Sequence, residues 1–391
     1  MKTVKILHTA DLHLGSDFPS LGRKGPERAT ELISSFRRML DYCRREDIDL
    51  LLIAGDFLES ATIKGEELGL IRDLLAGLES TELVISPGNH DYYSPDSPYA
   101  LEWPEGVHII RKRLESLVLL GGRVRLFGSA FLSSYNRESS LAGFSEMSRD
   151  ELDELYREKE DGVIFLGLFH GDIHAGEAGR GYNPIRMNDL PRGLFDYIAL
   201  GHIHKRTEIC YRGSTAYAYS GNPDPTSFSD SDLKGAYAGK VGRGVCDLHF
   251  IPFSSRLFMR VDVDLTGAEG YREMAERIRK VLAETGEDYR KNYYRIRLCG
   301  MRSGLPYFSL PVLMDDLAED LPYLDIIDDS MAAFDREAIS RDGTLRGSFI
   351  RSLLMDLDEA EKDGDFDRIQ VIKRALQTGL SAFDQEDCRV H

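Results

Sequence analysis

Five short polar clusters, each directly after an apolar run, constrain this chain more than any other feature of its sequence. They lie within the first 205 residues, where apolar runs that predict strands alternate with stretches of helical periodicity. Such alternation is typical of an α/β layer fold. The expected strands are residues 4–7, 50–54, 83–86, 107–110, 117–120, 124–131, 163–169 and 197–200, and the expected helices are 27–45, 66–78 and 149–160.

The clusters are rich in histidine, aspartate and asparagine. They end the segments ILHTADLHLG, LLLIAGDF, LVISPGNHD, VIFLGLFHGD and YIALGHIH. In an open α/β sheet, ligands bind outside the carboxyl ends of the strands, so we expect these loops to converge there. The candidate metal ligands are, in chain order, Asp11, His13, Asp56, Asn89, His170, His202 and His204.

This ligand set indicates a pair of transition-metal ions. Imidazole, carboxylate and amide groups suit Mn, Fe or Zn better than Ca, which takes oxygen ligands only. A single structural zinc ion needs four ligands, so seven candidates predict two ions. Asp56 stands alone at its strand end and is predicted to bridge them. Two ions about 3.5–4 Å apart activate a water and hold the attacking and leaving oxygens of a displacement, which is phosphoester chemistry.

Residues beside the ligands fit the same interpretation. His90 has an ionisable ring next to a ligand, so we predict that it is catalytic and either donates a proton to the leaving oxygen or stabilises the transition state, with Asp91 orienting it. Gly55, Gly88 and Gly201 each precede a candidate ligand, where the absence of a Cβ lets the chain turn sharply near the metals. Histidines outside the clusters, such as His8, are interpreted as structural.

The rest of the chain predicts two further regions. Residues 207–265 are rich in strand patterns and complete a first domain of residues 1–265. A helix–strand–helix–strand order then predicts a small α/β cap domain at residues 266–335. Two amphipathic helices follow in a C-terminal helical region at residues 336–391, which either docks a partner helix pair or packs on the cap.

Composition limits the classes of function. There is no apolar run of the roughly 18 residues that a membrane helix needs and no signal-peptide pattern, so we expect a cytoplasmic protein that does not contact a membrane. The net charge of −17 argues against passive attraction to a polyanion, so a basic surface for nucleic acid would have to be local. One candidate is the group of Lys205, Arg206, Lys234, Lys240 and Arg243.

The motifs in this order resemble the calcineurin-like metallophosphoesterase superfamily. ILHTADLHLG together with SGNPDPTSF is similar to the SbcD-type DNA repair nuclease branch, and the resemblance covers residues 4 to about 253. It implies a two-sheet β-sandwich flanked by helices and followed by a small cap domain. It also implies that His90 is the catalytic histidine and that the metals are held in two sets, Asp11, His13, Asp56 and His204, and Asp56, Asn89, His170 and His202.

The same resemblance implies a function. Nucleases of this branch act on DNA ends as manganese-dependent exonucleases and endonucleases, usually as homodimers bound to a coiled-coil ATPase of the SbcC type. This chain departs from many archaeal and eukaryotic relatives three residues after Asp56, where it has Glu59 in place of a histidine. Bacterial members often have an acid there.

Two other functions stay open on sequence alone. One is a small-molecule phosphatase or cyclic-nucleotide phosphodiesterase with the same dimetal centre. The other is a non-catalytic scaffold in which the metal only stabilises the fold. The length beyond residue 265 favours the nuclease, because a small-molecule enzyme needs no cap and helical tail. An intact ligand set together with His90 weighs against the scaffold.

Overall fold

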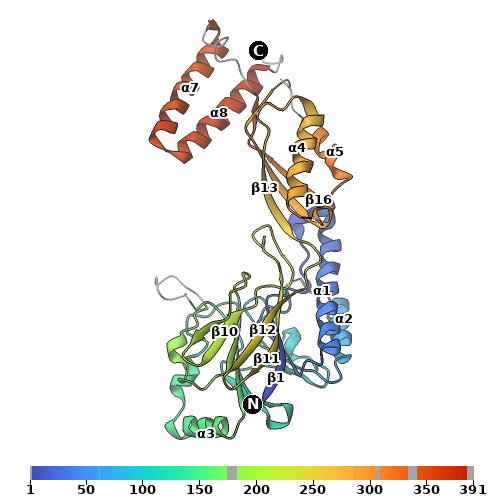
Figure 1. Ribbon diagram of the computed structural model, residues 1–391, viewed down its shortest axis with the longest axis vertical. Coiled ribbons are helices and arrows are strands. Elements are labelled where there is room, and N and C mark those ends of the chain that lie inside the picture. The colour runs from blue at the N-terminus through green and yellow to red at the C-terminus, as the bar shows by residue number, and fades with distance from the viewer. Residues whose placement is uncertain are drawn as a thin grey trace. The chain divides into compact units, whose positions relative to one another are not determined.

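The computed structural model describes residues 2–60, 62–173, 183–286, 288–303, 309–332 and 341–384. It consists of two compact units, residues 1–257 and residues 258–391 (Figure 1). The domain boundaries expected at residues 265 and 335 stay predictions. Within the described ranges, no helix is both long and apolar enough to cross a membrane.

The first unit contains two six-stranded mixed sheets. The first sheet has the order β12 (Val245–Pro252), β11 (Gly235–Gly242), β1 (Thr3–Thr9), β2 (Leu50–Ile53), β3 (Glu82–Ile85) and β4 (Val107–Ile109), with β1 to β4 parallel. The second has the order β5 (Glu115–Leu119), β6 (Val124–Gly128), β7 (Ile164–His170), β8 (Tyr197–Gly201), β10 (Thr215–Tyr219) and β9 (Cys210–Arg212), with β6, β7, β8 and β10 parallel.

The two sheets pack face to face over one apolar core. Ile6, Leu52 and Val84 of the first sheet share this core with Leu126 and Leu166 of the second. Alternate residues of a strand point to the same face, so the opposite faces remain for helices. The flanking helices are α1 (Gly25–Arg45), α2 (Gly65–Ala76) and α3 (Arg149–Glu160). This arrangement confirms the predicted α/β fold of two sheets flanked by helices.

The sequence patterns do not predict β11, which pairs with both β1 and β12. Three glycines in GAYAGKVG argue against a strand on propensity alone. In the structure these glycines allow close pairing. A Cβ on Gly235 would lie 2.0 Å from the carbonyl oxygen of Ile251, and one on Gly239 would lie 2.0 Å from that of Asp247.

The second unit has a parallel sheet of β13 (Phe258–Asp264), β14 (Tyr293–Cys299) and β16 (Tyr323–Asp328). Helices α4 (Gly270–Glu284) and α5 (Leu310–Ala318) pack on it through an apolar cluster that includes Met274, Ile278 and Leu313. Helices α7 (Leu345–Asp363) and α8 (Phe366–Asp384) form a hairpin with its own core, which includes Met331 of β17 (Met331–Ala332). The terminal helices therefore pack on each other and on β17.

Candidate metal centre

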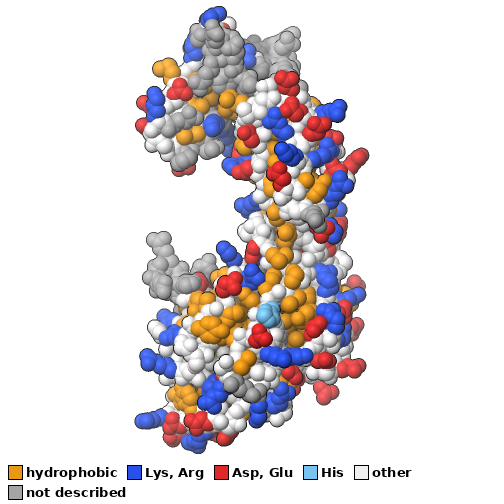
Figure 2. All heavy atoms as spheres, viewed as in Figure 1, with side chains coloured by type: hydrophobic (Ala, Val, Ile, Leu, Met, Phe, Trp, Pro, Cys, Tyr) orange, Lys and Arg blue, Asp and Glu red, His pale blue; other side chains and the backbone are white. Residues whose placement is uncertain are grey.

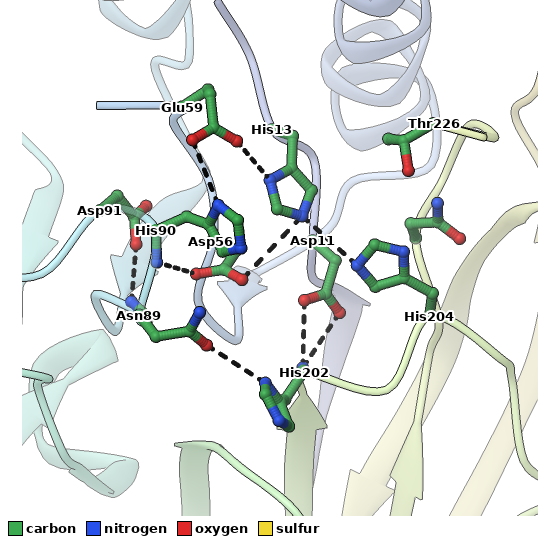
Figure 3. A network of polar contacts seen from close by, with 12 residues as sticks. Asp11, His13, Asp56, Glu59, Asn89, His90, Asp91, His202, His204 and Thr226 are labelled. Atoms are coloured by element: carbon green, nitrogen blue, oxygen red, sulfur yellow. Dashed lines mark hydrogen bonds and ion pairs between the residues drawn. The ribbon is translucent and has the colours of Figure 1, made fainter. Parts of the chain in front are cut away.

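The seven candidate ligands all lie at the carboxyl ends of strands, and the structure brings them together. Figure 3 labels all of them except His170. They come from both sheets, because β1, β2 and β3 belong to the first sheet and β7 and β8 to the second. The first sheet supplies Asp11 and His13 after β1, Asp56 after β2 and Asn89 after β3. The second supplies His170, the last residue of β7, and His202 and His204 after β8.

Four of these residues have backbone conformations that side chains rarely adopt. The φ angles are 55° at Asp11, 48° at His13, 48° at Asp56 and 96° at His202. Hydrogen bonds fix this backbone, with the Asp11 N–H donating to the carbonyl of Gly55 at 3.0 Å and the His13 N–H to that of Asp56 at 2.9 Å. Positive φ at residues other than glycine costs about 1–3 kcal/mol each and clusters at functional sites.

The first group of ligand atoms converges between His13 and His204. The His13 Nδ1 lies 3.1 Å from Glu59 Oε2 and the His204 Nδ1 lies 3.6 Å from Asp230 Oδ1, so each ring turns its Nδ1 side to a carboxylate. The two Nε2 atoms face each other only 3.3 Å apart, and in the tautomer with both protons on Nδ1 both Nε2 atoms are lone-pair acceptors. Asp11 offers a carboxylate oxygen within 4.8 Å of both rings. Acceptors that face one another repel unless a cation lies between them, so these residues fit a metal ion.

The second group converges around His170. Its Nδ1 donates to the carbonyl oxygen of Ala54 at 2.8 Å, so its Nε2 faces the other members of the group, and an ion that binds there would displace the Nε2 proton. That Nε2 lies 3.3 Å from Asp56 Oδ2 and 3.1 Å from Asn89 Oδ1, and the same amide oxygen lies 3.2 Å from His202 Nδ1. Asp56 Oδ2 is also 3.9 Å from His13 Nε2, so it faces both groups. This is the position that a bridging carboxylate needs.

The electrostatics of the cluster favour a cation. Burial opposes ionisation of Asp56, but the neighbouring His170 holds the pKa of the Asp56 carboxyl well below its usual range. Burial likewise opposes protonation of His170, but Asp56 and Asp11 raise its pKa to about 9. A buried site that retains a proton so strongly has a negative potential, which also attracts a divalent ion.

His90 lies beside the ligand groups with its ring held by Glu59 (Figure 3). Its Nδ1 is 3.1 Å from Glu59 Oε1, and its backbone N–H donates to Asp56 Oδ1 at 2.9 Å. The hydrogen bond to Glu59 is the largest of the effects that raise the His90 pKa to about 9. Burial raises the pKa of Glu59, but its bonds to His13 and His90 outweigh this and lower it to about 2. Glu59 therefore joins a candidate ligand to the candidate acid, a role that the sequence did not assign.

Asp91 has a different environment from the one expected. Its buried carboxylate accepts hydrogen bonds from the backbone N–H groups of Gly88 at 2.7 Å, Phe57 at 2.7 Å and Leu58 at 3.0 Å, and from the hydroxyl of Tyr99. Both oxygens are occupied by these donors. The expectation that Asp91 orients the His90 ring is thus corrected, because Glu59 contacts that ring, whereas Asp91 ties the loop after β2 to the loop after β3.

The three glycines before the ligands lie in close contact with neighbouring groups, as the sequence predicts. A Cβ on Gly55, whose φ is 90°, would lie 2.2 Å from His170 Nδ1, and one on Gly88 would lie 2.2 Å from Asp56 Oδ1. On Gly201 it would lie 1.8 Å from the carbonyl oxygen of Ala54. No larger residue fits at these positions without moving a candidate ligand or its support.

The loop after β10 supports His204. Asp230 is 4% exposed and accepts hydrogen bonds from the side chains of Asn222 at 3.1 Å and Thr226 at 2.9 Å. Lys234 is 2% exposed, lies 2.6 Å from Asp232 and donates to the carbonyl oxygen of His204 at 2.8 Å. The proposed role of Lys234 in a basic surface is therefore wrong, because the side chain is buried against acidic groups. The motif SGNPDPTSF, residues 220–228, marks this loop in the sequence, but no sequence pattern predicts the role of Asp230 two residues after it.

His8 has the structural role expected of it. The buried ring lies between β1 and β8, with Nδ1 2.8 Å from the Tyr197 hydroxyl and Nε2 3.2 Å from the carbonyl oxygen of Leu200. Burial lowers its pKa to about 3, so the ring is neutral.

Surface charge forms no extended basic area on the face that Figure 2 shows. Lys and Arg side chains are mixed there with Asp and Glu side chains. Arg206, another member of the expected basic group, lies over the ring of Phe250, with its guanidinium carbon 4.0 Å from the ring centroid. Of that group, Lys205, Lys240 and Arg243 are exposed.

Comparisons with known proteins agree with this site. The family model described as calcineurin-like phosphoesterase matches residues 4–206, more than half of the chain. An uncharacterised metallophosphoesterase of Bacillus subtilis, YhaO, is 29% identical over 274 residues, which cover 67% of this chain and 64% of that protein. One of the subunits of the nuclease SbcCD of Staphylococcus epidermidis is 24% identical over 60% of this chain and 65% of its own length.

Two further proteins are similar to this chain. The DNA double-strand break repair protein Mre11 of Methanopyrus kandleri is 27% identical over 60% of this chain and 52% of its own length. The chain thus spans less than two thirds of the length of each of these three relatives. Among solved structures, a dimetal phosphatase from Danio rerio is 12% identical, with a TM-score of 0.37 and coverage of 64% of this chain and 99% of its own.

Proposed function

This chain belongs to the calcineurin-like phosphoesterase family, and from this premise we propose that it is a DNA nuclease with exonuclease and endonuclease activity. The family makes the chain a metal-dependent phosphoester hydrolase. The observation that carries the proposal is the convergence of two groups of acceptor atoms on Asp56 beside a protonated His90. DNA as the substrate is supported by two relatives, one named as part of a nuclease and the other as a DNA repair protein.

The ligand assignment follows the two groups of acceptors. Asp11, His13, Asp56 and His204 would hold one ion, and Asp56, Asn89, His170 and His202 would hold the other. When bound, the ions lower the pKa of a water and polarise the phosphoryl oxygens. We assign Mn²⁺ as the metal, with Fe or Zn as alternatives that the same nitrogen and oxygen ligands accept.

His90 acts as the general acid. Because Nδ1 is bonded to Glu59, the proton available for transfer is the one on Nε2. The hydrogen bond to Glu59 raises the pKa of His90, which favours a ring that can protonate the leaving oxygen as the phosphorus–oxygen bond breaks. Glu59 positions this ring and the His13 ring together, and Asp91 holds the loop from which His90 projects.

The proposed assembly is a homodimer bound to an SbcC-like coiled-coil ATPase. The α7–α8 hairpin exposes Leu345, Met355 and Val371, which are 78%, 73% and 69% exposed. Exposed apolar side chains on helices are possible contacts for partner helices.

The test is Mn²⁺-dependent cleavage of end-labelled duplex and single-stranded DNA, with bis-p-nitrophenyl phosphate as a small diester. The wild type is expected to cleave DNA, and His90→Gln and Asp56→Asn to lose this activity. The matched control is His249→Gln, because His249 is an exposed histidine on β12 outside the site, and it should cleave like the wild type.

The outcomes separate the competing functions. Hydrolysis of the small diester with DNA left intact would point to a small-molecule phosphodiesterase, or to a nuclease that cleaves DNA only with its ATPase partner. No turnover of either substrate by the wild type would leave the non-catalytic scaffold.

A further inference from the structure

Two open hollows lie on either side of the Glu59–His90 pair. One, of about 390 Å³, is lined by His13 and His204, and the other, of about 610 Å³, is lined by Asn89 and Tyr92. Glu59 and His90 contribute to both. The candidate acid therefore stands at the boundary between the ligand groups and the larger hollow.

The larger hollow has a mixed lining, in which the rings of His90 and Tyr92 and the carboxyl groups of Glu59 and Asp96 accompany four serine side chains. Among the residues that the structure describes, none of its lining side chains is Lys or Arg, whereas Ser60, Ser94, Ser97 and Ser134 offer hydroxyl groups. The Oγ of Ser60 is buried and has no hydrogen-bond partner within the described part of the chain. Phosphate groups are bound mainly by Lys, Arg and backbone N–H groups, so this hollow suits an uncharged part of a substrate that has hydrogen-bonding groups.

Tyr92 gives the hollow an aromatic wall on a well-supported loop. Its side chain is 38% exposed, while Asp91 on one side is fixed by its four hydrogen bonds and Tyr93 on the other donates its N–H to the carbonyl of Phe131 at 2.8 Å. Ser97 further closes the loop by donating to the carbonyl oxygen of Ser94 at 2.8 Å. An aromatic ring whose backbone is already fixed loses little freedom when a base stacks on it.

We infer that this hollow receives the nucleoside attached to the leaving oxygen, and that Tyr92 stacks on its base. The inference rests on the proposed function, because His90 protonates the leaving oxygen and the hollow adjoins His90. Stacking on an aromatic side chain contributes about 1–3 kcal/mol per base and accepts every base, so the site selects nucleosides without reading sequence.

The first experiment measures binding without catalysis. The probe is 2-aminopurine 2′-deoxyriboside, whose fluorescence is quenched when the base stacks, titrated with the full-length protein in Mg²⁺. Tyr92→Ala is expected to weaken binding roughly 5- to 150-fold, which is the stacking contribution converted to a ratio of constants. Tyr92→Phe should bind like the wild type. The matched control Tyr211→Ala removes an exposed tyrosine from β9, outside the hollow, and should also bind like the wild type.

The second experiment measures cleavage of DNA with a base or an abasic sugar on the leaving side. The wild type should show a lower KM for the substrate with the base, and Tyr92→Ala should lose this difference. Equal probe affinity in the wild type and in Tyr92→Ala would overturn the inference even if DNA is cleaved. If the wild type binds the probe through Tyr92 but cleaves no DNA, the nuclease proposal fails and the nucleoside site stands.

Discussion

Replacing Asp91 by alanine removes the shared acceptor of four hydrogen bonds. The backbone N–H groups of Gly88, Phe57 and Leu58 would lose their partner in the interior, and so would the Tyr99 hydroxyl. A buried donor without a partner costs about 1–3 kcal/mol, although water that enters the space left by the carboxylate satisfies some of them. We therefore expect Asp91→Ala to lower the free energy of unfolding by about 3–5 kcal/mol, and Tyr99→Phe by about 1 kcal/mol.

The fluorescence of Trp103, the single tryptophan of the chain, can be used to follow unfolding. Trp103 stacks on Tyr99 with ring centroids 5.9 Å apart, so its fluorescence reports unfolding of the first unit where the bonds are lost. Urea titrations of the wild type, Asp91→Ala and Tyr99→Phe at one metal concentration give the three free energies. An Asp91→Ala protein that cleaves no phosphodiester but unfolds within about 0.5 kcal/mol of the wild type would refute this reasoning and make Asp91 part of the chemistry.

Three further predictions concern the metals, the glycines and pH. Removing metal with EDTA should lower the thermal midpoint of Trp103 fluorescence, and restoring Mn²⁺ to roughly 100 times its Kd should recover about 2.7 kcal/mol for each of the two ions. In Asp56→Asn this recovery should shrink, and a full recovery would contradict the bridging assignment. Gly201→Ala should lose bound metal, measured by mass spectrometry of the purified protein, because its Cβ would meet the carbonyl of Ala54. Gly69→Ala in α2, where a Cβ would have nothing within 4 Å, should keep its metal and gain up to about 1 kcal/mol in free energy of unfolding. Equal metal content in both variants would argue against close approach at Gly201. The pKa of His8 is about 3 in the folded chain and 6.5 in an unfolded one, so the unfolded state binds the proton more tightly and the free energy of unfolding falls as pH drops below 6.5, by about 2 kcal/mol at pH 5. Urea titrations at pH 7 and pH 5 should show that His8→Gln loses about 2 kcal/mol less of its free energy of unfolding than the wild type does. Equal losses in the two proteins would show that His8 is not buried in its neutral form.

Local patterns in the sequence predict the position of the site well. Each candidate ligand follows an apolar strand within a few residues, so the strand pattern and the ligand type lie in the same short segment, as at Asp56 and His170. Parallel strands then bring their carboxyl ends to one edge of a sheet without further information. The glycines before the ligands are also local signals, because only a residue without a Cβ fits beside Asp56 or Ala54.

Features that depend on distant partners are less accessible from the sequence. The glycine-rich β11 is a strand because β1 and β12 pair on both of its sides, which outweighs its low propensity. The role of Glu59 depends on two histidines, 46 residues before it and 31 residues after it. Asp91 and Asp230 are acidic residues in loops, and only the folded structure shows that one holds two loops and the other faces His204.

The pairing of β1 also sets an order of events during synthesis. One edge of β1 pairs with β2, within the first 53 residues, but the other pairs with β11, where Ile6 lies opposite Gly239. At about 5–20 residues per second, a ribosome needs roughly 10–50 seconds to add the residues between them. During that time the nascent first sheet has an open edge, which is the kind of edge that recruits other chains. A chain halted before residue 235 would keep that edge open and lack β11 and β12 altogether.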